Sequence, residues 1–339
     1  PFGRYPDGAP TFRRLANVTQ GTGNARPLFS DVVINEVQYH PASNDEDEEF
    51  VEIHNRGTNA VALALWRLSG GISFTFPTGA SLPAGGHLVV AHDMNALLTA
   101  HPSLNPALVI GGFNGKLANS GDVVRLDKPD EVVATNQFGQ FVTNKLHIVV
   151  DEVTFGTGGR WGRWTDGFGS SLERTDPRAD GHLPSNWADS DESAKSGWTT
   201  VEFTGVLDNG ALASPDQLQL FLLGPGECLV DNVEVILQGG ANVVANGTFD
   251  SGASGWFWQG THEQSVWQAT GGFSGGCLRV VASDRGDTGA NRIRSVLTQT
   301  LSTGITATLR AKVRWLKGHP EILLRLHGNR DQLAGLAGE

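Results

Sequence analysis

The side chains with the clearest binding chemistry in this sequence are aromatic and lie close together. Five of them fall between positions 256 and 273: Trp256, Phe257, Trp258, Trp267 and Phe273. Aromatic faces that are open to solvent bind sugar rings through the C–H surfaces of those rings, and tryptophan adds a polar N–H group. We therefore predict a ligand-binding surface that contains Trp256, Trp258 and Trp267.

Strand alternation restricts this prediction. Successive side chains of a strand point to opposite faces, so Trp256 and Trp258 share one face and Phe257 points to the other. One of the two sets must belong to the core, and tryptophan more often fills a core than contacts a ligand. The alternation alone does not say which set is buried.

The acidic run Asp45–Glu49 is a candidate cation site, because calcium prefers oxygen ligands. The run lacks the ligand spacing and the turn glycine of an EF-hand. A charge run between two strands is more often a solvated loop, and we expect a solvated loop here. Glu36, Glu49 and Glu52 alternate with apolar residues, so we expect their side chains to face solvent.

The sequence contains no arrangement with a recognised catalytic spacing. It has no G-x-S-x-G elbow, no H-E-x-x-H motif, no cysteine–histidine nucleophile context and no Walker-type phosphate loop. Five histidines are expected to be surface or turn residues: His40, His54, His262, His319 and His327. We predict that the chain is not an enzyme.

Composition indicates a mostly β chain of two domains. The 339 residues include 44 Gly, 15 Pro and nine Trp, which suits short strands joined by tight turns. The net charge of −11 and the scattered basic residues predict no nucleic-acid partner. No run of about 18 apolar residues occurs, so we predict no membrane span in this chain, which we expect to be part of a longer protein.

The chain divides by pattern into five segments. Residues 1–30 contain "FGRYPDGAPTFRRL", which resembles "WGRWTDGFGSSLERTDP" from Trp161 and is predicted to be the trailing piece of a preceding repeat, followed by a linker. Residues 31–178 alternate apolar and polar residues in seven or eight short strands, with Trp66 and Phe76 as candidates for burial. Residues 179–197 are predicted to be a linker, residues 198–330 a second strand-rich domain, and residues 331–339 a tail.

Six motifs in the first domain carry a family resemblance. Their order and residues resemble a bacterial lamin tail domain over residues 31–178, which implies an immunoglobulin-like β-sandwich without catalytic residues. The motifs are "VINEVQYHP", "EFVEIHNRG", "LWRLSGGISFTFPTGASLPAGGHLVVAHD", "LANSGDVVRLDKPDEVVA", "VDEVTFG" and "WGRWTDGFGSSLERTDP".

The second domain resembles the galactose-binding-like jelly rolls that serve as carbohydrate-binding modules. In that family an opening "N-G-x-F" strand comes first and an aspartate-containing strand closes the module, whereas here "LVDNVEVI" precedes "NGTFDSGASGW". Two explanations remain open: one circularly permuted jelly roll, or two half modules meeting end to start. Strand counting favours the permuted module, in which "HPEILLRLHG" would lie beside "WTTVEFTG".

This second resemblance implies two residue pairs. A structural calcium ion in such modules uses an acidic residue of the opening strand and the aspartate of the closing strand, which here are Asp250 and Asp231. Paired carboxylates repel each other unless a cation or hydrogen bonds compensate, so the alternative is two strand-end aspartates that cap turns. Cys228 and Cys277 are expected to lie close together, either bridged or as a reduced pair.

The resemblances imply a non-catalytic accessory or adhesion fragment of a secreted or cell-surface bacterial protein. Its expected partner is a polysaccharide or cell-surface glycan bound by the jelly roll. The alternative is a structural spacer or fibre-forming repeat that assembles with neighbouring domains or other copies. An unrecognised hydrolase is a third hypothesis.

Overall fold

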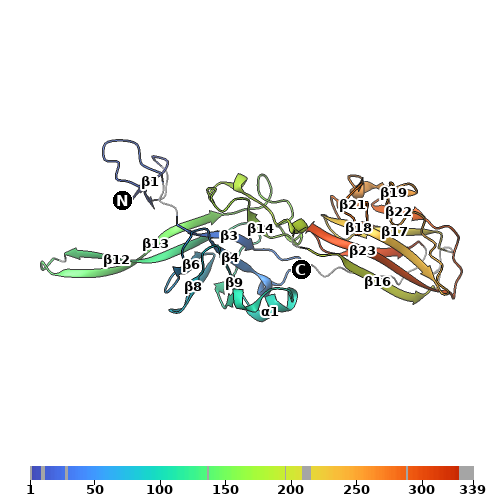
Figure 1. Ribbon diagram of the computed structural model, residues 1–339. Coiled ribbons are helices and arrows are strands. Elements are labelled where there is room, and N and C mark those ends of the chain that lie inside the picture. The colour runs from blue at the N-terminus through green and yellow to red at the C-terminus, as the bar shows by residue number, and fades with distance from the viewer. Residues whose placement is uncertain are drawn as a thin grey trace. The chain divides into compact units, whose positions relative to one another are not determined.

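The computed structural model describes residues 2–8, 12–26, 30–135, 137–194, 196–207, 215–287 and 289–327 (Figure 1). The fold is all-β, as predicted, and α1 (Met94–Ala100) is the one α-helix among these residues. The chain forms two compact units: Pro1–Asp166 with Ser171–Ala188, and Gly167–Ser170 with Asp189–Glu339. The predicted tail, residues 331–339, lies outside the described residues.

The first unit is a two-sheet sandwich. One sheet has the order β10-β9-β4-β3-β14-β15 and the other β11-β7-β6-β12-β13, with two small additional pairs, β5-β8 and β1-β2. The strands of the first sheet are β10 (Val109–Gly111), β9 (His87–Ala91), β4 (Phe50–Asn55), β3 (Val32–Gln38), β14 (Leu172–Arg174) and β15 (Trp187–Asp189). Those of the second are β11 (Asn114–Gly115), β7 (Ile72–Thr75), β6 (Arg67–Gly70), β12 (Val123–Thr135) and β13 (Phe141–Thr154). The small pairs are β5 (Val61–Ala62), β8 (Ser81–Leu82), β1 (Phe2–Arg4) and β2 (Phe12–Arg14).

The core of this sandwich follows the alternation of its strands. In β4, Val51 and Ile53 are fully buried, and Glu52 between them points away from the core. Trp66 is 4% exposed and Phe76 fully buried, which confirms both burial predictions. Burial of a large apolar side chain stabilises a fold by about 1.5–3 kcal/mol, so these aromatic side chains are a substantial part of the core.

The segment predicted as a linker, residues 179–197, is ordered in its described part. It contains the short 3-10 helices η3 (Pro184–Asn186) and η4 (Glu192–Ala194) on either side of β15. Trp187 packs into the core of the first sandwich, and its indole N–H donates to the Gly181 carbonyl at 2.8 Å. A buried tryptophan therefore fixes a segment that its polar composition marked as a loop.

Strands β12 and β13 continue beyond the first sandwich as a two-stranded arm (Figure 1). The two strands pair from Val123↔Thr154 to Thr135↔Phe141. The next strand, β6, pairs with β12 only as far as Asp127. Residues 128–148, which we call the arm, thus make their strand pairings with one another.

The second unit is also a sandwich of two antiparallel sheets. The larger sheet has the order β16-β23-β18-β21-β20, and the smaller has the order β19-β22-β17-β24. The larger sheet consists of β16 (Thr199–Val206), β23 (Thr306–Gly318), β18 (Gly226–Leu237), β21 (Cys277–Ala282) and β20 (Val266–Gln268). The smaller consists of β19 (Trp256–Gln259), β22 (Arg292–Val296), β17 (Gln217–Leu222) and β24 (Ile322–Leu326). Strands from both sides of the "QGGAN" joint interleave in each sheet, so they build one sandwich and not two half modules.

One predicted pairing in this unit is wrong. The C-terminal strand β24 does not lie beside β16 but pairs with β17, with Leu220 opposite Leu324. Strand β16 pairs instead with β23, with Glu202 opposite Arg310. The apolar residues of β17 and β24 are buried, which places both strands in the smaller sheet over the common core.

Candidate functional site

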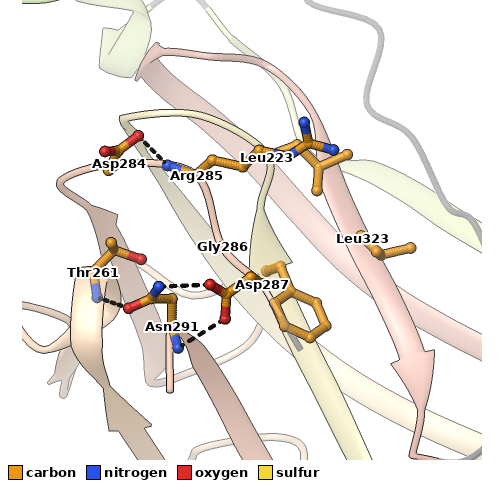
Figure 2. A pocket seen from close by; sticks show the side chains of 9 residues that line it. Leu223, Thr261, Asp284, Arg285, Gly286, Asp287, Asn291 and Leu323 are labelled. Carbon is orange, nitrogen blue, oxygen red and sulfur yellow. Dashed lines mark hydrogen bonds between the residues drawn. The ribbon is translucent and has the colours of Figure 1, made fainter. Parts of the chain in front are cut away.

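A cavity of about 560 Å³ lies in the second unit, and we call it the loop pocket (Figure 2). It is formed where the loop after β21 meets the end of β17, the 3-10 helix η5 (Gly260–His262) and β24. Its lining residues are Phe221, Leu223, Thr261, Asp284, Arg285, Gly286, Asp287, Asn291 and Leu323. The pocket combines an apolar side with several converging polar groups, which is typical of small-ligand sites.

The apolar side consists of Phe221, Leu223 and Leu323. Phe221 is 1% exposed, and the two leucines are half-buried. They come from the β17 end and from β24, which are adjacent strands of the smaller sheet. The sheet itself therefore holds this side of the pocket in place.

The polar side is organised by Asp287 and Asn291 (Figure 2). The Asp287 Oδ2 atom accepts a hydrogen bond from Asn291 Nδ2 at 2.8 Å, and Oδ1 accepts one from the Gly289 N–H at 2.8 Å. The Asn291 Oδ1 atom in turn accepts from the Thr261 N–H at 3.1 Å. These bonds, that from the Asn291 side chain first, lower the pKa of Asp287, so its carboxyl group is ionised and acts as an acceptor.

A buried histidine, His262, lies next to the pocket residues Thr261 and Gly286. His262 is fully buried, its Nε2 accepts the Leu222 N–H at 2.9 Å, and its Nδ1 lies 3.1 Å from the Thr261 Oγ1. Because Nε2 accepts, the proton is on Nδ1, which donates to the hydroxyl. Burial lowers the pKa of His262 to about 4. The expectation that His262 lies at the surface is wrong, because its ring is buried and forms hydrogen bonds with Thr261 of η5 and Leu222 of β17.

Gly286 is the point where the loop passes closest to this histidine. Its N–H donates to the Leu222 carbonyl at 2.8 Å. A Cβ atom at this position would lie 2.8 Å from the Phe221 Cβ and 2.9 Å from the His262 Cε1, too close for any larger residue without movement. The close approach turns Asp284 and Arg285 outward, and the Arg285 side chain extends towards Leu223 (Figure 2).

Of the three tryptophans predicted to bind a ligand, the structure places Trp256 in the core. Trp256 is 4% exposed, its indole N–H donates to the Asn246 carbonyl at 3.0 Å, and its ring centroid is 5.1 Å from that of Phe249. Trp258 and Trp267 are half-buried against the same core, and the Trp267 indole N–H donates to the Phe249 carbonyl at 2.7 Å. Trp256 is thus a core residue, and the alternating Phe257 and the distant Phe273 are about half exposed.

The structure brings Asp231 and Asp250 to the same loop, residues 272–275. Asp231 is fully buried and accepts the N–H groups of Asn232 at 2.7 Å and Ser274 at 3.0 Å. Burial, aided by the charge of the exposed Asp250, raises the pKa of Asp231. Asp250 accepts the Thr248 hydroxyl at 2.8 Å.

The hydrogen bonds of Asp231 give this carboxylate a structural role that does not require calcium. The Asp231 oxygens face backbone N–H groups, whose positive ends repel a cation, and no set of three or more His, Cys, Asp or Glu side chains suited to a metal occurs in the described part of the chain. Asp231 instead anchors the loop to β18 through hydrogen bonds. Calcium binding at Asp231 and Asp250 stays a prediction.

Cys228 and Cys277 are both buried, free thiols. They lie on the paired strands β18 and β21, but Cys228 faces the main core, whereas Cys277 packs with Leu229 and Leu316 on the opposite face of the sheet. Cys228 pairs with Val280, three residues from Cys277, so register and strand alternation both separate the two side chains. Burial raises the pKa of Cys277 to about 11, so it stays a thiol at neutral pH.

In the first unit the acidic run contains one buried residue. Residues Glu46–Glu48 form the 3-10 helix η1, capped by the Asp45 side chain, and are not buried. Glu49 is 1% exposed, and its Oε2 accepts the Leu117 N–H at 2.8 Å. Burial is the main cause that raises the pKa of Glu49 to about 7. The expectation that Glu49 faces solvent is wrong, because its carboxylate accepts the Leu117 N–H in the loop after β11.

Residues 27–140 match the family model of the Lamin Tail Domain. The predicted resemblance is thereby confirmed for this part of the first unit, and the two-sheet arrangement agrees with the immunoglobulin-like sandwich of that family. A comparison with curated proteins found no match to the chain. Within the described residues, no helix has the length and apolar character needed to cross a membrane.

Proposed function

We propose that the chain is a non-catalytic accessory or adhesion module whose second unit binds a glycan in the loop pocket. The observation that carries this proposal is the pairing of an apolar side with a fixed polar rim in one open cavity. A sugar ring has an apolar C–H face and hydroxyl groups at its edge. The half-buried Leu223 and Leu323 suit the face, and Asp284, Arg285 and Asp287 suit the hydroxyls.

The state of the carboxyl groups favours binding over hydrolysis. A glycosidase requires a general acid, which is a carboxyl group with a raised pKa. Hydrogen bonds lower the pKa of Asp287, so this residue is suited to accept from a hydroxyl and not to protonate a leaving group. We propose that Asp287 orients the ligand and that Arg285 contributes an exposed donor.

We further propose that the second unit is a circularly permuted jelly roll and that the protein acts outside the cell or at the cell surface. The permutation is supported by the interleaving of β16, β17 and β18 with strands that follow the "NGTFDSG" motif. The location rests on the resemblance to carbohydrate-binding modules. Neither the permutation nor the location depends on which ligand the second unit binds.

A glycan array probed with the full chain tests the proposed function. We expect retained glycans, and we expect Arg285→Ala to weaken binding about tenfold, because a hydrogen bond that involves a charged group contributes about 1.5–3 kcal/mol. Arg178→Ala removes the same charge from an exposed position of the first unit and serves as the control. An array without any retained glycan, or full binding by Arg285→Ala, would refute the proposal.

A second candidate function is assembly with other copies of the chain through the arm. Val133, Phe138 and Phe141 are 62%, 75% and 82% exposed, which is unusual for apolar residues that lie close together. Sedimentation of the full chain against the double variant Val133→Ser, Phe141→Ser tests this candidate. Self-association that the variant loses would support it, and a monomeric wild-type chain would exclude it.

A further inference from the structure

A second concave site lies on the outer face of the larger sheet in the second unit, and we call it the sheet groove. It has a volume of about 280 Å³, close to the lower end of the range of about 300–1,000 Å³ for small-ligand sites. Three adjacent strands, β16, β23 and β18, each supply two of its lining residues: Thr200, Glu202, Asn232, Glu234, Arg310 and Lys312.

The polar groups of the groove are placed by strand register. Arg310 on the central strand β23 lies opposite Glu202 on one side and Glu234 on the other. Its Nη2 atom lies 2.6 Å from Glu234 Oε2 and its Nη1 atom 3.4 Å from Glu202 Oε2. These bonds use one oxygen of each glutamate, so the other oxygen of each can accept from a ligand.

Asn232 adds a third acceptor through a β-bulge. The register of β18 against β23 shifts between Asp231 and Glu234, and Asn232 in this bulge has a φ of 47°. Bulges of this kind re-aim a side chain. The Asn232 Oδ1 atom is buried and accepts no hydrogen bond from the described residues. A buried acceptor without a donor is unfavourable, so a ligand donor here would stabilise the complex.

Charge balance indicates which donor fits. The groove contains two carboxylates and two cations, Arg310 and Lys312, and is therefore neutral. Its open oxygens require donors, but the two cations disfavour an ammonium or guanidinium group. The two carboxylates disfavour an anion. Hydroxyl groups of a neutral molecule satisfy both conditions.

An aromatic pair lies next to Lys312, outside the lining of the groove. The Lys312 Nζ atom lies 4.7 Å from the ring centroid of Phe273 and 2.6 Å from the Thr200 hydroxyl. The Phe273 ring is half exposed and meets the Trp198 ring edge to face at 6.0 Å between centroids. This pair offers an apolar surface next to the polar groups, as a sugar ring requires.

We propose that the sheet groove is a second saccharide-binding site, specific for a neutral sugar whose hydroxyls donate to Glu202, Glu234 and Asn232. The inference shares with the proposed function the premise that this unit binds saccharides. It uses different strands and different residues from the loop pocket. The two sites can therefore be tested separately in the same protein.

The test is a nuclear magnetic resonance titration of the labelled full chain with neutral hexasaccharides of glucose, mannose, xylose and galactose, and with an anionic hexasaccharide of galacturonic acid. The amides of Glu202 and Lys312 report on the groove, and those of Thr261 and Gly286 report on the loop pocket. We expect at least one neutral hexasaccharide to shift the groove amides, and the anionic one to leave them unchanged.

Two variants test the residues. Asn232→Gly removes the buried acceptor and tolerates the positive φ, and Glu202→Gln replaces a half-exposed carboxylate by an amide of similar shape. We expect each to weaken binding at the groove about tenfold. Thr204→Ala, on the same strand but outside the groove lining, is the control and should bind like the wild type.

The outcomes separate this inference from the proposed function. Neutral sugars that shift the loop-pocket amides alone would overturn the groove and leave the proposed function intact. Shifts at the groove alone would support the inference and overturn the loop pocket. Groove binding by the galacturonic acid chain instead, or unchanged binding by Asn232→Gly and Glu202→Gln, would overturn the assigned ligand class or the assigned residues.

Discussion

The buried His262 accepts, through Nε2, the hydrogen bond of the Leu222 N–H at 2.9 Å. This bond exists only while the ring is neutral, because a protonated imidazole has no acceptor nitrogen. It joins η5 to the end of β17, and both elements line the loop pocket. The protonation of one residue is therefore linked to the stability of the second unit and to the shape of its pocket.

We predict that the second unit loses stability as the pH falls. The pKa of His262 is lowered to about 4 by burial, from 6.5 in an unfolded chain. Between pH 6.5 and 4 the unfolded chain takes up a proton that the folded unit excludes, so the free energy of unfolding falls by about 3 kcal/mol across this window. Hydrogen exchange of β17 and β18 peptides against pH measures the loss, and His262→Gln should flatten this part of the profile.

For the first unit we predict the opposite sign. Burial raises the pKa of Glu49 to about 7 from 4.5. The folded unit keeps the proton that the unfolded chain releases, so Glu49 supports the fold below pH 4.5 and this contribution, about 3 kcal/mol, is lost as the pH rises through 7. Glu49→Gln should remove the dependence in β3 and β4 peptides and leave that of β17 unchanged. Equal slopes in wild type and variant would contradict the assignment.

A substitution at Asp231 tests whether this carboxylate is a hydrogen-bonded anchor of the loop or a calcium ligand. We predict that Asp231→Asn lowers the free energy of unfolding of the second unit by about 1–3 kcal/mol, since an amide replaces a buried carboxylate that accepts several N–H groups. A chelator should leave the melting temperature of the wild-type protein unchanged. Asp250→Asn, at an exposed position, is the matched control with a small effect. A lower melting temperature in the presence of the chelator would instead support calcium binding at Asp231 and Asp250.

The two cysteines provide a chemical check of the sheet register. Because Cys228 and Cys277 face opposite sides of the larger sheet, we predict that thiol titration of the denatured, unreduced protein counts two reactive thiols per chain. In the native protein both thiols should react slowly, since both are fully buried and burial raises both pKa values. A count of zero would show a bridge and a different register.

Composition and the pattern of short strands predict the all-β class and the burial of Trp66 and Phe76, and strand counting predicts the single sandwich formed across the "QGGAN" joint. Strand alternation does not predict which face of β19 points to the core, because Trp256 and Trp258 on one face and Phe257 on the other are all apolar. The burial of Glu49 and His262 also has no local signal, since their partners Leu117 and Leu222 are distant in sequence.

The loop pocket could not be predicted from the sequence for the same reason. Thr261, Asp287 and Leu323 come from three segments that meet only after both sheets have formed. Their side chains carry no motif and no fixed spacing. The sheet groove is easier to predict from the sequence, because Glu202, Glu234 and Arg310 occupy alternating outward positions of their strands. The bulge that orients Asn232 is not predictable in this way, since it depends on the pairing of β18 with β23.

The arm supplies the last prediction, because its residues pair only with one another in the described sheet. We predict that replacing residues 130–146 by an Asn-Gly turn leaves the sandwich of the first unit intact. The turn would join Pro129 and Lys128 to their partners His147 and Ile148 through a two-residue hairpin that suits strand twist. The melting temperature of the unit should change by only a few degrees, since surface changes away from the core usually alter stability by about 0.5 kcal/mol or less. Unfolding of the shortened chain would show that the arm packs on the sandwich. A shortened chain that stays folded and no longer self-associates would assign assembly to the arm.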